Sequence, residues 1–202
     1  MARVVLICAL VFASAAMAAP TAAQQVNAKL TPFDTLHATF VEEKHVEGLT
    51  KPLKSTGRLV YERSKGLLWL VEKPLASETL MTPTRLVQRV KGRVTVALDV
   101  AAQPSMQVIS RLFVASLTGD WAKLDADFDI TGDVKADGWK LVLTPKGGLF
   151  SKIAKRLEIT GNTAVDRVDL FELSGDTTTT SFAGHAFNAP LTPDEETRLV
   201  TK

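Results

Sequence analysis

Cysteine is nearly absent from this sequence, whose 202 residues contain only Cys8. Cys8 lies inside an apolar run that continues past it, so it is a poor candidate for lipid attachment. With one cysteine the chain forms no internal disulfide, and it offers no cysteine-based metal site. The sequence therefore tolerates an oxidising compartment without using it for crosslinking.

The sequence also lacks an apolar run of the roughly 20 residues that a membrane-spanning helix needs. Its N-terminal run covers only residues 4–12, after a start that carries Arg3 and before small residues that end at Ala18. This order is typical of a cleavable secretory signal peptide. We expect residues 1–18 to be removed, leaving one domain over residues 19–202; a retained N-terminal anchor is the alternative.

Neither sign of charge dominates, since 24 lysines and arginines face 22 aspartates and glutamates. Nucleic-acid binding rests on many cationic contacts with phosphate. We therefore expect no nucleic acid among the partners.

Catalytic and metal-binding motifs are missing as well. There is no G-x-S-x-G elbow, phosphate-binding glycine loop or H-E-x-x-H. The histidines His37, His45 and His185 lie far apart in the sequence. The acidic row around Asp127 fits a strand and lacks the distal glutamate of a calcium loop. We expect no catalytic residues, metal or cofactor, and thus no enzyme.

Alternating apolar and polar residues are abundant, as strands with one buried face require. Phe128 and Ile130, separated by Asp129, give the clearest case. Roughly ten or eleven short strands at hairpin spacing predict a mainly β (α+β) fold with one antiparallel sheet, curled into a barrel or sandwich. The clearest strand signals fall at 36–41, 58–62, 67–71, 86–90, 94–98, 128–131, 139–143, 157–159, 168–170 and 178–182.

Helical patterns are few. Residues 22–30 and the amphipathic stretch 105–117 are predicted helices, and 120–124 a shorter turn. Thr192 followed by Pro193 is a helix-start signal that predicts a C-terminal helix ending at Leu199.

Several predicted strands are apolar on both faces, such as 67–71. Either helices cover the second face, or part of it lines an internal cavity, as in small barrels that hold apolar ligands. Arg63 shares strand parity with Leu59 and Tyr61, and a buried cation needs an acceptor. Arg63 therefore has two possible roles. Either it lies past the strand end and reaches solvent, or it donates hydrogen bonds to backbone carbonyls or to a polar ligand group at a cavity mouth.

Several short segments follow one another in a distinctive order. They are an aromatic first strand at 36–43, a glycine-led second strand ending in arginine at 57–63, a strand tryptophan at 67–69 and a proline at Pro74. A later segment, residues 141–146, reads Leu-Val-Leu-Thr-Pro-Lys. Together these segments resemble the LolA family of lipoprotein carriers.

The resemblance implies an incomplete antiparallel β-barrel whose open side is covered by helices. It implies a periplasmic, monomeric carrier of acyl chains that receives its ligand from an inner-membrane release complex or exporter and delivers it to an outer-membrane acceptor. Arg63 would latch the helical lid. The side chains expected to line the cavity are Phe40, Leu59, Tyr61, Trp69, Val71, Met81, Met106, Ile109, Phe113, Trp139 and Leu141.

One segment differs from the best-known members of the family. Residues 51–57, Lys-Pro-Leu-Lys-Ser-Thr-Gly, are similar to a branch that accompanies the export of aryl-polyene or other lipid-like products. The ligand is therefore either a lipoprotein or a lipid-like product. A periplasmic sensor with the same barrel and, more remotely, an acyl hydrolase are the alternative functions.

Overall fold

The computed structural model describes residues 19–100, 102–148 and 150–200. The expected signal peptide lies outside these residues. The described chain forms an antiparallel sheet of eleven strands in the order β6-β5-β4-β3-β2-β1-β11-β10-β9-β8-β7. The strands are β1 (Thr35–His45), β2 (Leu53–Glu62), β3 (Gly66–Lys73), β4 (Ser77–Met81), β5 (Arg85–Val90), β6 (Arg93–Asp99), β7 (Phe128–Val134), β8 (Trp139–Pro145), β9 (Ala154–Gly161), β10 (Val165–Glu172) and β11 (Thr177–Phe187).

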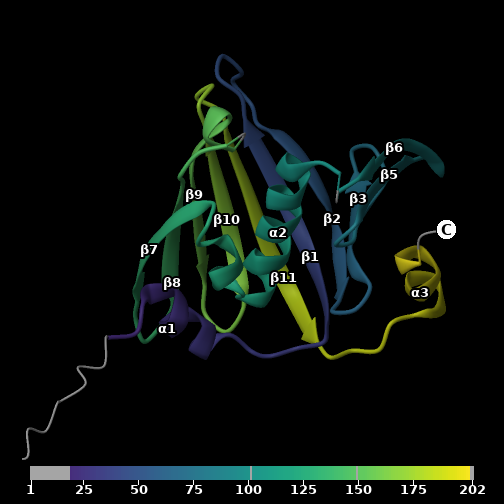
Figure 1. Ribbon diagram of the computed structural model, residues 1–202. Coiled ribbons are helices and arrows are strands. Elements are labelled where there is room, and N and C mark those ends of the chain that lie inside the picture. Colours follow the sequence, from purple (N-terminus) through teal and green to yellow (C-terminus); the bar gives the residue numbers. More distant parts are fainter. Residues whose placement is uncertain (1–18, 101, 149, 201–202) are drawn as a thin grey trace, which may run out of the picture.

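The two edge strands, β6 and β7, do not pair with each other, so the curved sheet stays open. Helix α2 (Pro104–Thr118) lies across the concave face in front of β1 and β11 (Figure 1). Helix α1 (Ala22–Lys29) packs against β7, and α3 (Pro193–Leu199) packs against β3. Short 3-10 turns cover Trp121–Leu124 and Phe150–Lys152. This arrangement confirms the predicted incomplete antiparallel barrel with covering helices.

The concave face is filled at its two flanks. On the β7–β9 flank, α1 and the turn after α2 bury Val26, Trp121 and Leu124 against Leu141 and Ile159. On the β1–β3 flank, a second cluster packs Leu59, Tyr61 and Met81 around Phe33 and Leu117. Between these clusters lies the central part of the sheet that faces α2.

The convex face has its own apolar cover, which explains why strands such as β3 are apolar on both sides. Leu68 and Leu70 point to the outer face, where they pack with Val60 and Leu80 against Leu199 of α3. Leu67, the neighbour of Leu68, points to the inner cluster. Helical cover therefore accounts for the outer face of β3.

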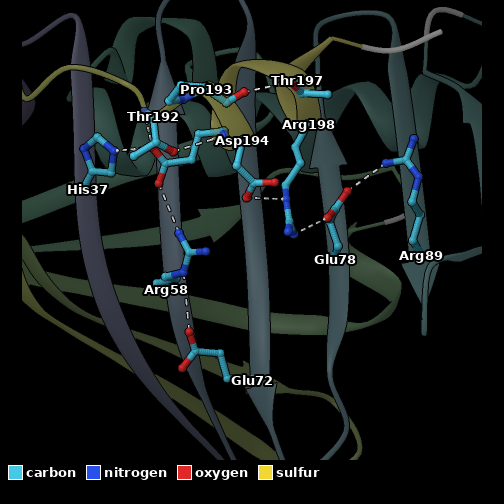
Figure 2. Close-up of polar contacts among 11 residues, drawn as sticks. His37, Arg58, Glu72, Glu78, Arg89, Thr192, Pro193, Asp194, Thr197 and Arg198 are labelled. Carbon is cyan, nitrogen blue, oxygen red and sulfur yellow. Dashed lines mark hydrogen bonds and ion pairs between the residues drawn. The ribbon is translucent and has the colours of Figure 1, made fainter.

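Polar contacts fix α3 on this outer face (Figure 2). Glu195 is 5% exposed; it accepts a hydrogen bond from Arg58 Nη1 at 3.1 Å, and its Oε2 lies 3.2 Å from His37 Nε2. Arg198 donates to Glu78 at 2.9 Å, and Glu78 also accepts from Arg89 at 2.8 Å. Burial opposes ionisation of Glu195, but hydrogen bonds from Thr192 and His37 outweigh it and hold the pKa of this carboxyl below its ordinary value.

Candidate functional site

An apolar cavity of about 300 Å³ lies between α2 and the concave face of the sheet. This volume is at the lower end of the range for small-molecule sites. Strands from both halves of the sheet contribute to it, together with one face of α2. The lining residues are Glu42, Trp69, Ile109, Leu112, Phe113, Ser116, Leu117, Phe150, Ile153, Leu157, Val165, Val168, Leu170, Thr178, Thr180 and Phe182.

Aromatic rings form one wall of the cavity. The Trp69 ring stacks on Phe40 at a centroid distance of 4.0 Å and meets Phe113 and Phe182 edge-on at 6.0 and 6.1 Å. Gly57 makes room for this stack, because a Cβ there would lie 2.8 Å from the Phe40 ring and collide with the Leu70 carbonyl. The glycine that begins the resemblance motif on β2 therefore has a packing role beneath the cavity wall.

Helix α2 supplies the opposite wall. Pro104 occupies its first turn, and Gly119 ends it with a φ of 75°, a conformation that glycine adopts without strain. Leu112 is 6% exposed, whereas Phe113, which also lines the cavity, is 37% exposed. An exposed aromatic ring at a cavity wall is apolar surface available to a ligand.

The cavity adjoins a second cleft beside α2, and their common border is called the mouth. This cleft of about 250 Å³ shares Ile109, Phe150 and Ile153 with the cavity and is also lined by Asp127 and Lys146. Near this mouth Arg111 of α2 donates a 2.7 Å hydrogen bond to Asp127, ahead of β7. Movement of α2 away from the sheet would have to break this ion pair.

One end of the cavity is polar. Glu42, Thr178 and Thr180 line it, and the Glu42 carboxylate accepts a hydrogen bond from Ser55 Oγ at 3.3 Å. The cavity is thus amphiphilic, with an apolar length and a polar end.

Three of the residues predicted from sequence meet at this cavity: Trp69, Ile109 and Phe113. Phe40 lies one layer behind them, under Trp69. The Met106 side chain lies outside the described residues. Their contact with a ligand stays a prediction.

The other predicted lining residues lie elsewhere. Leu59, Tyr61 and Met81 belong to the cluster around Phe33, and burial raises the pKa of the Tyr61 phenol. Trp139 and Leu141 belong to the cluster with Trp121, whose ring lies edge-on to Trp139 at 6.3 Å. Val71 lines a different cleft beside α3, which arginines and glutamates dominate. The positions in the two clusters have the correct strand parity, but neighbouring side chains already fill the space before them.

Several lining residues were not predicted from the sequence. Phe182 and Leu170 sit in strands that were predicted, and their parity could have identified them once the pairing of β10 with β11 was known. Phe150 and Ile153 come from a short 3-10 turn and its end, where no periodic signal exists.

Arg63 bonds the segment between α1 and β1. Its Nε donates to Asp34 at 2.7 Å and its guanidinium donates to the Phe33 carbonyl at 2.6 Å, while the side chain is 62% exposed. It thus both reaches solvent and bonds a backbone carbonyl. Among the described residues these hydrogen bonds lead to the α1–β1 segment and not to α2, so the role of Arg63 as a latch stays a prediction.

In the described part of the chain, no helix has the length and apolarity to cross a bilayer. In the same residues, no group of three or more histidines, cysteines and acidic residues is placed to hold a metal ion.

Solved structures with a similar fold come from several bacteria, at low identity. A LolA superfamily protein from Nitrosomonas europaea matches with 10% identity and a TM-score of 0.46, over 90% of this chain and 96% of that one. The lipoprotein LppX of Mycobacterium tuberculosis matches with 9% identity and a TM-score of 0.44, over 84% and 93%. MucB, in the MucA/MucB complex of Pseudomonas aeruginosa, matches with 16% identity and a TM-score of 0.43, over 83% of this chain but 56% of that one.

A search of curated proteins found no match to this sequence. The family model described as "Outer membrane lipoprotein carrier protein LolA-like" matches residues 14–201. That range includes every strand and helix of the described residues. The chain therefore belongs to the LolA-like family of outer membrane lipoprotein carrier proteins.

Proposed function

We propose that this protein is a periplasmic carrier that holds the acyl chain of a lipoprotein or lipid-like product under α2 and passes it toward the outer membrane. The observation that carries the proposal is the apolar cavity of about 300 Å³ between α2 and the sheet. Membership of the LolA-like family supports the same function.

The size of the cavity sets the length of chain that it shields. A cavity of about 150 Å³ holds one benzene ring, so a cavity twice that size takes roughly twelve carbons. Each buried CH₂ contributes about 0.8 kcal/mol, which gives roughly 10 kcal/mol of transfer free energy for such a chain. Much of this is offset by the loss of motion on binding.

A carrier must also release its ligand. The cavity wall is formed by aromatic and aliphatic side chains such as Trp69, Val168 and Leu170, whose contacts with a chain are weak and non-directional. No single strong bond then has to break when the chain slides out. The mouth beside Phe150 and Ile153, bordered by the Arg111–Asp127 pair, is the proposed exit.

The proposed partners are a donor at the inner membrane, either a release complex or an exporter, and an acceptor at the outer membrane. The protein is proposed to act as a monomer after removal of residues 1–18. The choice between a lipoprotein and an aryl-polyene-type product stays open.

Native mass spectrometry of the protein purified from its own periplasm tests the proposal. We expect a bound species that carries an acyl chain and a mature N-terminus at Ala19. Recovery from the cytoplasm with an intact leader, or a ligand-free protein that also fails to bind added acyl probes, would contradict it.

A further inference from the structure

The polar end of the cavity is built by three neighbouring strands. Glu42 follows Phe40 on the same face of β1, and in the sheet it lies opposite Ser55 of β2 and Thr180 of β11. Thr178 lies two residues before Thr180 on the same face of β11, and both line the cavity. The concave face therefore changes from aromatic to polar at Glu42.

Glu42 differs from its neighbours in its charge partners. Glu43 pairs with Lys54 at 3.0 Å, and Lys44 pairs with Glu172 at 2.8 Å and Asp176 at 3.4 Å. In the described part of the chain, no lysine or arginine forms an ion pair with Glu42. Its one side-chain hydrogen bond comes from Ser55, and an ionised carboxylate accepts about four.

The surrounding charges favour a cation over an anion. Lys44 shares the strand face of Glu42, but two carboxylates already neutralise it. Glu42 and the two partners of Lys44 thus carry three negative charges against the one positive charge of Lys44. We expect this local excess to disfavour a carboxylate or phosphate at the hydroxyls of Thr178 and Thr180.

We propose, on the basis of the proposed carrier function, that the cavity selects amphiphiles whose polar group donates hydrogen bonds and carries no negative charge. An amine or a hydroxyl on an alkyl chain would donate to the Glu42 carboxylate, while the chain lies along Trp69, Phe182 and Leu170. Glu42 is then the residue that determines specificity, and the aromatic wall provides most of the affinity.

Competition against a fluorescent acyl probe tests this inference with three ligands of equal chain length: dodecylamine, dodecanol and dodecanoate. Each is used below its micelle concentration at neutral pH. We expect the wild type to bind the amine most tightly and the carboxylate least, with about tenfold between them, the effect of one charge-assisted hydrogen bond. Glu42→Gln should remove the advantage of the amine and leave dodecanol within about twofold.

Two variants control for surface charge and folding. Glu43→Gln removes the same charge one residue away, on the opposite face of β1, and should leave the ranking unchanged. Glu42→Lys should reverse the ranking in favour of dodecanoate, provided that its thermal unfolding matches the wild type.

The outcomes separate the inference from the proposed function. Equal binding of all three ligands by wild type and Glu42→Gln, or tightest binding of dodecanoate by the wild type, overturns the inference and leaves the carrier function standing. Failure of the probe and of all three ligands to bind the wild type contradicts the carrier function itself.

Discussion

Filling the cavity with a side chain of the protein should abolish acyl binding without unfolding the sheet. Ser116 suits this purpose, because it lies on α2, lines the cavity and is 7% exposed. Ser116→Phe places a ring of benzene size, which needs a cavity of roughly 150 Å³, into the 300 Å³ cavity.

The expected loss of binding free energy follows from the number of ligand carbons that the ring displaces. Half of the cavity corresponds to about six methylenes, worth roughly 5 kcal/mol at 0.8 kcal/mol each. A loss of this size weakens Kd by about three orders of magnitude. Because the ring fills a void that neighbouring apolar side chains already line, we expect the free energy of unfolding to change by less than about 2 kcal/mol.

The assay is titration of a fluorescent acyl probe, with thermal unfolding measured on the same samples. Thr50→Phe adds the same ring at an exposed position away from the cavity and serves as the control. If a folded Ser116→Phe variant binds the probe as tightly as the wild type, the acyl chain of the probe lies outside this cavity, and the proposed binding site is wrong.

Three further predictions concern the surrounding structure. Gly57→Ala should lower the free energy of unfolding by about 1–3 kcal/mol through overpacking against Phe40, and so lower the melting temperature. The control Gly147→Ala has no atom near its added Cβ and should change the melting temperature little. Equal melting temperatures of the two variants would contradict this. Since the folded-state pKa of Glu195 is depressed, its contribution to holding α3 is present above its ordinary pKa of 4.5 and lost as the pH falls through the lower folded-state pKa. Protection factors of residues 193–199 against hydrogen exchange should therefore fall in acid, and Glu195→Gln should lower them at neutral pH as well; protection factors that stay high throughout would count against it. Arg63→Leu should change stability by about 1 kcal/mol or less for an exposed pair, yet alter hydrogen exchange of α2 and slow ligand transfer; unchanged exchange and transfer would argue against a latch.

The sequence predicted most of the fold because its periodic signals are local. Alternation around Phe128 and Ile130 gives β7, and the threonine, proline and acidic residues before Leu199 give the capped helix α3. The strand β4 was missed, because Leu80 and Met81 are adjacent and do not alternate. Its assignment depends on pairing with β3 and β5, which is long-range information.

The site was predicted less completely, for a different physical reason. Parity places Trp69 and Trp139 on the concave face alike, but only packing decides which of them borders a void. Trp121 and α1 fill the space beside Trp139, whereas Trp69 lines the cavity that lies beneath α2. That difference comes from segments distant in sequence. Glu42 was likewise not among the predicted lining residues, because its place in the cavity depends on the register between β1 and β11.

Photocrosslinking of an alkyl-diazirine fatty alcohol, mapped by peptide mass spectrometry, would locate a bound acyl chain on the protein. We expect crosslinks on the cavity wall, at Trp69, Phe113 and Phe182, and their loss in Ser116→Phe. Crosslinks confined to the outer cleft beside α3, at Val71 or Val200, or labelling that Ser116→Phe leaves unchanged, would contradict an acyl chain held beneath α2.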